Sequence, residues 1–382
     1  MRKLAVRKVS DVKRIVVKVG TSIITEEGGS ISSEKVENIV KQISRAKKDG
    51  LEIALVSSGA IAAGIEKMGM KKRPRDIGKL QAVAAVGQGL LMEMYSRVFK
   101  SHGLTVGQIL ITEQDMNHRQ QYLNARRTFK RLFEMGVVPI INENDTVATD
   151  EITFGDNDML AALVAALIDA GLLVLLTDTA GLYTEDPRKS KGAKLIECVE
   201  DITEDIVCLG GETESPFALG GMSSKLQAVR TAVNSGVSAI IADGRKAEIL
   251  NDILSGKKVG TYFPSKGRVS SRKHWIGYVK KSCGRLIVDD GAASAITGRG
   301  ASLLPAGVIG VEGNFHVGDA VDIVLRDGKL IARGISNYDH DEAKKIMGKR
   351  SEEVERMLGV AQEIVHRDGL VVLSRGLKDA NW

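Results

Sequence analysis

Short runs of apolar and β-branched residues recur along the chain up to about residue 265, and most of them run into a turn rich in Gly, Ser, Thr or Asp. Such runs predict buried strands that lead into tight turns. They begin near residues 14, 51, 103, 136, 171 and 236. Between them, apolar residues recur every three to four positions, as in residues 32–50, which predicts helices. Alternating strands and helices predict a mostly parallel sheet with helices on both faces.

The pattern changes after about residue 265. Residues 261–275, TYFPSKGRVSSRKHW, are polar and basic and include a proline, which predicts a linker. Beyond it, short alternating runs flank Asp327-Gly328, a pair that is typical of a β-hairpin. We therefore expect a small β-rich barrel after the α/β domain. The expected division is residues 1–265 for the first domain, 266–279 for a linker, 280–362 for the second domain and 363–382 for a C-terminal tail.

Composition places the chain among globular proteins, with 43% hydrophobic and 27% charged residues. Three cysteines without a C-x-x-C pair argue against a disulfide framework or a zinc site, and they suit a reducing cytoplasm. The basic N-terminus lacks the apolar segment of a signal peptide. The longest apolar stretch, residues 160–176, contains Asp169 and Gly171. It predicts a helix, a turn and a buried strand instead of a membrane span.

The formal net charge of +6 raises the question of nucleic-acid binding. The excess of Lys and Arg is small in both parts of the chain, so a solvated basic surface is the favoured interpretation and nucleic acid is not expected as a partner.

One stretch gathers acid without compensating base. Residues 142–158, NENDTVATDEITFGDND, hold six carboxylates and neither Lys nor Arg. Asp and Asn are common in loops because they form turns. The alternative is that these carboxylates face a cation, such as a substrate ammonium, a metal ion or a lysine from elsewhere in the chain.

Four further segments follow predicted strands or open predicted helices, where ligands bind in open α/β sheets. Lys18 lies near the end of one strand and Gly20 follows it, although a lysine there can also extend its ammonium group into solvent. Ser57 and Ser58 end another, where they could also serve as a helix cap. The remaining candidates for nucleotide contacts are Thr177, Asp178, Leu219, Gly220, Gly221, Met222, Ser223, Ser224 and Lys225.

Several common nucleotide and hydrolase signatures are missing from the sequence. It contains no G-x-x-x-x-G-K-[ST] loop, no G-x-G-x-x-G after a strand and no G-x-S-x-G elbow. Two lysines and an acidic centre nevertheless fit phosphoryl transfer, in which a protein mainly positions charges.

Taken in order, several segments closely resemble the glutamate 5-kinases of the amino acid kinase family. They are VVKVGTS, VSSGAIAAG, QAVAAVGQ, VGQILIT, NARRTF, PIINENDTVA, FGDND, LLTDTAGLYTEDPR and GGMSSKLQAV. Beyond residue 280, GASLLPAGVIGVEGNFHVGDAV and IARGISNY resemble a PUA domain.

This resemblance implies an α/β/α sandwich, a C-terminal PUA barrel, and ATP-dependent phosphorylation of the γ-carboxylate of L-glutamate with Mg²⁺, the first step of proline biosynthesis. It implies that Lys18 and Lys225 stabilise the transferred phosphoryl group and that Asp158 orients both lysines. It assigns glutamate to Ser58, Asp145, Asn157 and Asp156, and ATP to Lys18, Gly20, Thr177, Asp178 and residues 219–225.

The resemblance also implies a cytoplasmic homo-oligomer, feedback inhibition by proline, and transfer of the product to glutamate-5-semialdehyde dehydrogenase. Two features depart from the family pattern: Thr153 replaces a basic residue, and Ala218-Leu219 replace Gly-Thr. Two alternatives stay open. One is a sister kinase that acts on another small carboxylate, and the other is RNA binding through the PUA domain.

Overall fold

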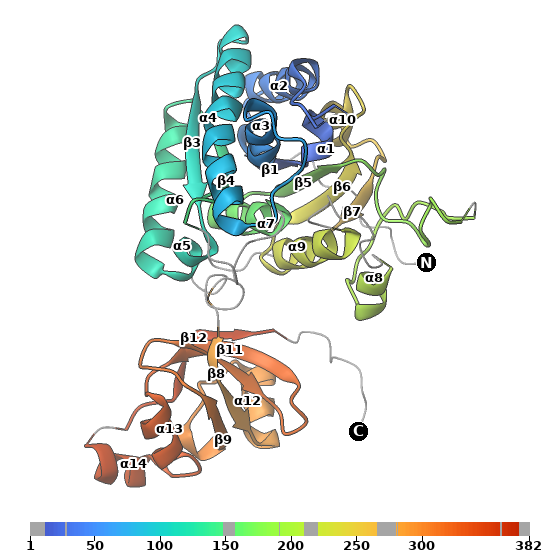
Figure 1. Ribbon diagram of the computed structural model, residues 1–382. Helices are drawn as coiled ribbons and strands as arrows, with labels where there is room; N and C mark the ends of the chain where they lie inside the picture. The colour runs from blue at the N-terminus through green and yellow to red at the C-terminus, as the bar shows by residue number, and fades with distance from the viewer. Residues whose placement is uncertain are drawn as a thin grey trace. The chain divides into compact units, whose positions relative to one another are not determined.

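The computed structural model describes residues 12–26, 29–147, 157–190, 192–209, 221–265, 280, 282–359 and 361–373. The chain divides into two compact units, Met1–Arg268 and Val269–Trp382 (Figure 1). The expected linker, residues 266–279, lies entirely outside the described residues.

The first unit contains a seven-stranded sheet in the order β3-β4-β2-β1-β5-β6-β7. All neighbouring strands run parallel except β7, which pairs antiparallel with β6. The mostly parallel sheet predicted from the sequence is therefore confirmed. The strands are β1 (Arg14–Val19), β2 (Glu52–Ser57), β3 (Val106–Ile111), β4 (Val138–Glu143), β5 (Leu172–Thr177), β6 (Ser238–Asp243) and β7 (Thr261–Phe263).

Helices cover both faces of this sheet, as Figure 1 shows. One layer includes α2 (Ser33–Lys48), α3 (Ala60–Lys67), α4 (Ile77–Ser101) and α10 (Ile249–Leu254). The other includes α7 (Asn157–Leu167) and α9 (Met222–Asn234). The shorter or peripheral helices are α1 (Thr21–Ile24), α5 (Glu113–Asn117), α6 (Arg119–Glu134) and α8 (Glu204–Cys208).

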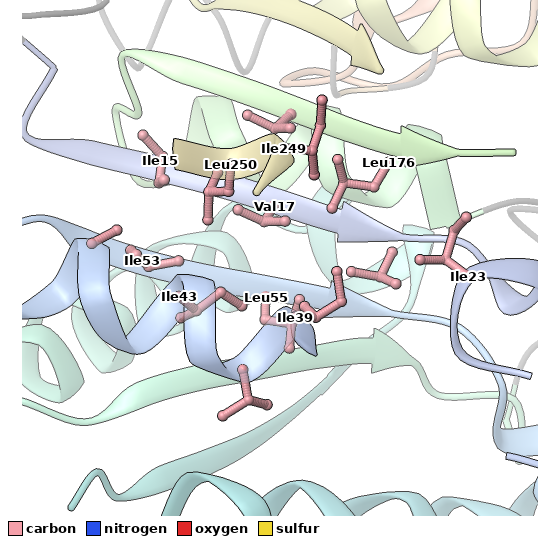
Figure 2. Close-up of a cluster of buried hydrophobic side chains, with 14 of the residues drawn as sticks. Ile15, Val17, Ile23, Ile39, Ile43, Ile53, Leu55, Leu176, Ile249 and Leu250 are labelled. Carbon is pink, nitrogen blue, oxygen red and sulfur yellow. The ribbon is translucent and has the colours of Figure 1, made fainter. Parts of the chain in front are cut away.

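The alternation of side chains along β1 decides which residues enter the core and which enter the site. Ile15, Val17 and Val19 face α2 and belong to one hydrophobic core with Ile39 and Leu55 (Figure 2). Since successive side chains of a strand point to opposite faces, Lys18 points to the face that α7 covers. The position of Lys18 is thus fixed by three apolar neighbours that bury the other face.

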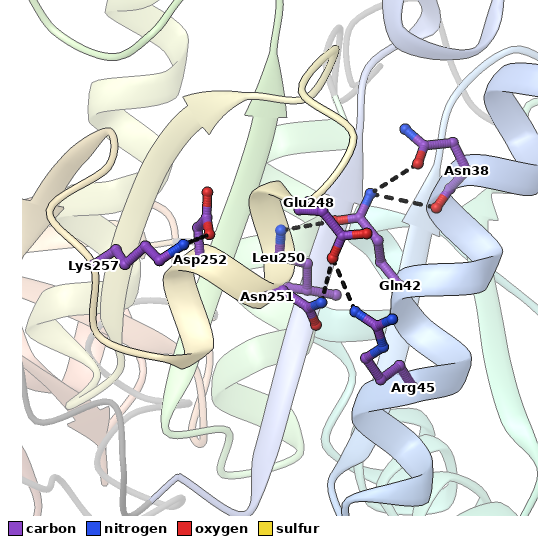
Figure 3. A network of polar contacts seen from close by, with 8 residues as sticks. All are labelled: Asn38, Gln42, Arg45, Glu248, Leu250, Asn251, Asp252 and Lys257. Atoms are coloured by element: carbon purple, nitrogen blue, oxygen red, sulfur yellow. Dashed lines mark hydrogen bonds and ion pairs between the residues drawn. The ribbon is translucent and has the colours of Figure 1, made fainter.

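A polar network ties α10 to α2 (Figure 3). Glu248 precedes α10 but makes no side-chain cap. Instead, the buried Gln42 of α2 accepts a hydrogen bond from the backbone N–H of Leu250 at 2.8 Å. Arg45 adds an ion pair with Glu248 at 2.9 Å. A side chain from α2 therefore satisfies an N–H group that the helix start leaves without an acceptor.

The two helices after β2 touch backbone to backbone. A Cβ atom on Gly87 of α4 would lie 1.7 Å from the carbonyl oxygen of Ala60 in α3. A Cβ atom on Gly64 of α3 would lie 2.0 Å from the carbonyl oxygen of Val83. Only glycine allows this approach, so the two glycines set how close α4 lies to α3.

The second unit contains a five-stranded sheet in the order β12-β11-β10-β8-β9, with its own hydrophobic core. The hairpin predicted around Asp327-Gly328 is present, since β10 and β11 pair antiparallel. The elements are β8 (Ser282–Val288), α12 (Asp290–Arg299), a 3₁₀ turn (Pro305–Gly307), β9 (Val308–Gly313), β10 (Ala320–Val324), β11 (Leu330–Ser336), α13 (His340–Ile346), α14 (Ser351–Leu358) and β12 (Val365–Val372).

Two boundaries expected from the sequence need correction. Strand β12 lies after residue 362, where we expected a tail, but it pairs antiparallel with β11 and so extends the second sheet. Residues 261–263, which open the polar segment that we interpreted as a linker, form the buried strand β7. Both strands carry sequence signals that are weak alone, and pairing with a neighbouring strand stabilises them.

The long apolar stretch 160–176 folds as α7, a turn at Asp169 with φ of +53°, and β5. Within the part of the chain that the structure describes, no helix has the length and apolar character needed to cross a bilayer.

We expect a chain that ends at Ser265 to fold without the second unit, because all seven strands of the first sheet end by Phe263 and the two cores share no residue. Thermal unfolding followed by circular dichroism should give one cooperative transition.

A chain that ends at Gly260 is the matched control, because it lacks β7. Tyr262 and Phe263 are buried, and Thr261 Oγ1 donates to the carbonyl of Ile196 at 2.7 Å. Loss of even one such aromatic side chain from a core costs about 3–5 kcal/mol. Equal stability of the two truncated chains would contradict the assignment of β7 to the sheet.

Candidate functional site

The register of the parallel strands brings the candidate residues to one edge of the first sheet. Val19 lies opposite Ser57 of β2 and Leu176 of β5, and Thr177 lies opposite Asp243 of β6. These are the carboxyl ends of parallel strands, where ligands bind in open α/β sheets. Residues far apart in sequence thus meet at the position predicted for a site.

The centre of this edge is Asp158, a fully buried carboxylate. Its Oδ1 atom lies 2.6 Å from Nζ of Lys18, and its Oδ2 atom lies 2.9 Å from Nζ of Lys225. The Lys18 side chain is 4% exposed and that of Lys225 is 11% exposed. Two cations share one carboxylate, so the three groups together carry a formal charge of +1.

Each member of this centre comes from a different element. Lys18 lies on β1, Asp158 in the first turn of α7, and Lys225 in the first turn of α9. Helices α7 and α9 pack against each other. Asp158 thus joins β1 to α9 through its two ion pairs, and its orienting role in catalysis stays a prediction.

A second group of contacts surrounds Asn157, the residue before Asp158. Its Nδ2 atom donates to Oγ of Ser58 at 2.9 Å and to Oδ1 of Asn142 at 2.8 Å, with a longer contact to the carbonyl of Ser57 at 3.3 Å. Two of the residues assigned to glutamate, Ser58 and Asn157, are therefore in direct contact.

Ser57 is held from behind by α4. Its Oγ atom lies 2.8 Å from the hydroxyl of Tyr95, and both side chains are fully buried. Burial raises the pKa of Tyr95 to about 12, against the opposing effect of this hydrogen bond, so the phenol stays neutral near pH 7. This contact anchors the end of β2 beneath the site.

Asp145 lies in the turn after β4 and is partly buried. Burial raises the pKa of its carboxyl group, and the positive charge of Arg73 opposes that rise. Arg73 lies between α3 and α4, and burial lowers the pKa of its guanidinium while Asp145 opposes the change. The two charges therefore act on each other at the site edge, a partnership that the sequence did not predict.

The nucleotide candidates that the structure describes lie beside the lysine centre. Thr177 ends β5 and its Oγ1 atom donates to Asp178 at 3.1 Å. Gly221 precedes α9, and Met222, Ser223 and Ser224 form its first turn. The first N–H groups of a helix lack intrahelical acceptors and favour anions. The N–H of Gly20 donates to the carbonyl of Leu176 at 3.3 Å, and the role of Gly20 toward ATP stays a prediction.

Arg245 is a second cation that the sequence did not predict. It contacts Asp243 at the end of β6, with both guanidinium–carboxylate distances at 2.8 Å. Hydrogen bonding to Asp243 raises the pKa of Arg245, and the nearby charge of Asp178 adds to this effect. The ends of β5 and β6 thus carry a charged cluster beside the nucleotide candidates.

Several predicted positions lie outside the described residues: Asp156, Leu219 and Gly220, together with the family departures Thr153 and Ala218. Their roles remain predictions. Gln88 and Asn142, by contrast, belong to motifs that the sequence analysis quoted without giving these residues a role. The only signal in the sequence for a role of these two residues was a side-chain amide in each motif, and only the fold brings the two amides together.

Residues 13–243 match the amino acid kinase family, and residues 284–358 match the PUA domain. The chain belongs to the amino acid kinase family. Its likeness to curated relatives extends over both units. It is 48% identical to a glutamate 5-kinase of Thermoanaerobacter sp. (strain X514) over 368 residues, which covers 96% of this chain and 99% of the relative.

A glutamate 5-kinase of Thermus thermophilus is 45% identical over 362 residues, covering 94% of this chain and 97% of the relative. Among solved structures, a carbamate kinase from Giardia lamblia bound to AMP-PNP matches with a TM-score of 0.50 and 17% identity. It covers 67% of this chain and 100% of its own length. This likeness supports the fold of the amino acid kinase domain.

We predict that Asp158→Asn destabilises the kinase domain by about 3–5 kcal/mol, because it removes a buried partner and leaves two lysines without their counter-charge. Urea unfolding at neutral pH measures the difference.

Asp252→Asn is the matched control. Asp252 forms an ion pair with the exposed Lys257 at 2.6 Å (Figure 3). A surface pair of this kind contributes about 0–1 kcal/mol. If the two variants lost similar stability, Asp158 would not be the electrostatic centre described above.

Proposed function

We propose that this chain transfers the γ-phosphoryl group of ATP to the side-chain carboxylate of L-glutamate, which gives ADP and L-glutamyl 5-phosphate, the first step from glutamate to proline. The observation that carries the proposal is the buried Asp158 carboxylate between Lys18 and Lys225 at the carboxyl edge of the sheet. Full-length relatives that are named glutamate 5-kinase support glutamate as the acceptor.

The reaction needs no general base. The γ-carboxyl group of glutamate has a pKa of about 4.3 and is already ionised near pH 7. One carboxylate oxygen attacks the γ-phosphorus, and the bond from this phosphorus to the bridging oxygen of ADP breaks, so that ADP leaves with the electron pair. The barrier lies in bringing two anions together and in stabilising the transferred group.

Lys18 and Lys225 supply the charge that this step requires. Each ammonium group is paired with one oxygen of Asp158, and the three groups together carry a formal charge of +1. Because Asp158 is fully buried, water screens this charge little. The carboxylate keeps the lysines in place before ATP binds, so less reorganisation is needed in the transition state.

Glutamate would lie between the amide group of Asn157 and the carboxylate of Asp145. The contacts that support this position include Ser58, whose Oγ atom accepts from Asn157. Asp145 offers its charge to the substrate ammonium, and Arg73 lies near enough to act on Asp145. A role for Asp156 remains part of the proposal.

ATP would use the start of α9 and the ends of β5 and β6. Mg²⁺ binds through one or two carboxylates and the phosphates of its nucleotide in many kinases. Among the described residues, no cluster of three or more His, Cys, Asp or Glu side chains could hold a metal alone. Mg²⁺ would enter with ATP, with the exposed carboxylate of Asp178 as its candidate protein ligand.

The proposal includes a cytoplasmic homo-oligomer, inhibition by proline and delivery of the product to glutamate-5-semialdehyde dehydrogenase. Delivery of the product has a chemical basis, because an acyl phosphate is a reactive anhydride that water destroys. Proline shares its α-carboxylate and amino group with glutamate, so a shared site would explain competition between them.

The test of the function is ADP release with L-glutamate, compared with acetylglutamate, aspartate, carbamate and UMP. Hydroxylamine traps an acyl phosphate as a hydroxamate and so identifies the product. Turnover with another acceptor but not with glutamate would favour a sister kinase. Steep, salt-dependent binding of labelled RNA without turnover would favour the RNA-binding alternative.

Lys18→Ala and Lys225→Ala should each lower kcat by about 10²–10³-fold, because each removes an electrostatic contact to the transferred group. Steady-state kinetics at saturating glutamate and ATP measures the effect. Lys257→Ala, at an exposed lysine of the same domain, is the control. A kcat that stays within about threefold in either site variant would remove that lysine from the mechanism.

The pH dependence of glutamate binding should report Asp145. Its carboxylate pairs with the substrate ammonium only when ionised, so glutamate binding weakens as the pH falls through the Asp145 pKa. Burial raises this pKa and Arg73 lowers it. Arg73→Met should therefore move the acidic limb of kcat/KM for glutamate to higher pH, whereas Arg75→Met, at an exposed residue of the same loop, should not.

Asp145→Asn should lack the acidic limb of kcat/KM for glutamate that Asp145 causes. It should also raise the KM for glutamate about ten- to hundredfold, with the KM for ATP unchanged. The γ-carboxyl group of free glutamate titrates in all variants, so only differences between their profiles are informative. Identical profiles for Arg73→Met and the unmodified chain would show that Arg73 does not act on Asp145.

A further inference from the structure

A chain of three side-chain amides runs from helix α4 to the first residue of α7. Gln88 Oε1 accepts from Nδ2 of Asn142 at 2.8 Å, and Oδ1 of Asn142 accepts from Nδ2 of Asn157 at 2.8 Å. Asn142 is 4% exposed. The three residues come from α4, β4 and α7, so this series of hydrogen bonds forms only in the folded domain.

One backbone group fixes which way round the amide of Asn142 lies, and Gln88 anchors that amide from its other side. The N–H of Glu143 donates to Oδ1 of Asn142 at 2.9 Å. A backbone N–H can only donate, so the oxygen of Asn142 must face it. The Nδ2 atom of Asn142 then points to Gln88, whose Oε1 atom accepts the hydrogen bond.

The same constraint passes to Asn157. Its Nδ2 atom faces the oxygen of Asn142 and also donates to Oγ of Ser58 and, at 3.3 Å, to the carbonyl of Ser57. A rotation of this amide by 180° would set its oxygen against the oxygen of Asn142. The Oδ1 atom of Asn157 is therefore turned away from Asn142, and it is buried without a hydrogen-bond partner among the described residues. A buried acceptor without a donor is costly, so a ligand that brings a donor is favoured.

We propose that Gln88 is a positioning residue for substrate recognition: through Asn142 it holds the Asn157 amide with its oxygen free to accept from the amino group of the substrate. The inference rests on the proposed function, because it takes an amino acid as the ligand. It adds a residue on α4 that makes no contact with substrate itself.

The position of Gln88 is set by its neighbour in sequence. Gly87 lies against the backbone of Ala60, and any side chain there would push α4 away from α3. On the next residue, the side chain of Gln88 accepts from Asn142 of β4. The paired Gly-Gln in the motif QAVAAVGQ thus has one residue for helix packing and one for the amide chain.

The test compares three substitutions at one position. Gln88→Met keeps the length of the side chain but lacks the acceptor, and Gln88→Lys offers only donors. Both should raise the KM for L-glutamate about tenfold, the effect of one hydrogen bond, with kcat and the KM for ATP within about threefold. Gln88→Glu keeps an acceptor and should hold the KM for glutamate within about threefold of the unmodified chain.

A double-mutant cycle tests whether Gln88 acts through Asn157. In an Asn157→Ala background, the effect of Gln88→Met on the KM for glutamate should shrink to about twofold or less, because the amide that it positions is absent. Glu93→Leu, at an exposed residue of α4, controls for general effects on this helix and should leave all constants unchanged.

Three results would overturn the role of Gln88: an unchanged KM in Gln88→Met, a Gln88→Glu variant as impaired as Gln88→Met, or independent effects of Gln88→Met and Asn157→Ala. Each requires an unmodified chain that phosphorylates glutamate. If the unmodified chain and Glu93→Leu both release no ADP with glutamate, the proposed function fails and this inference fails with it.

Discussion

The ion pairs of Asp158 with Lys18 and Lys225 are the interaction on which the arrangement of the site depends. A carboxylate that is fully buried is costly unless cations and hydrogen bonds compensate it. Here the compensation comes from β1 and α9, two elements separated by about half of the chain. The same contacts that make the burial tolerable place both lysines at the carboxyl edge of the sheet. Structural need and electrostatic function therefore coincide in one contact.

Around this centre, the fold fixes the orientation of side-chain amides that could otherwise rotate. Asn157 is adjacent to Asp158 at the start of α7, so the position of the helix sets both side chains. The backbone N–H of Glu143 sets which way round the Asn142 amide lies, and Gln88 anchors that amide from its other side. Asn142 in turn accepts from Asn157 and so helps to set which atom of Asn157 is presented. A ligand of Asn157 would meet a preorganised group, which lowers the cost of ordering it on binding.

The second unit has its own sheet and its own core, and every residue proposed for catalysis lies in the first. The match to a PUA domain describes this unit but does not extend the chemistry of the site. Each unit builds its own core from its own residues, so the sequence changes its pattern near residue 265. Long apolar runs suit strands buried between two helical layers, whereas alternating runs suit strands with one exposed face.

The sequence alone determined the alternation of strands and helices, because periodicity is a local property. Its motifs also implied, through their resemblance to a family, that Lys18, Asp158 and Lys225 share one chemistry. It did not determine β7 or β12, since short strands depend on the neighbour with which they pair. It also gave no role to Arg73, Asn142 or Gln88. Their contacts join elements that are distant in sequence, and such distances and amide orientations arise only when the sheet and its helices pack together.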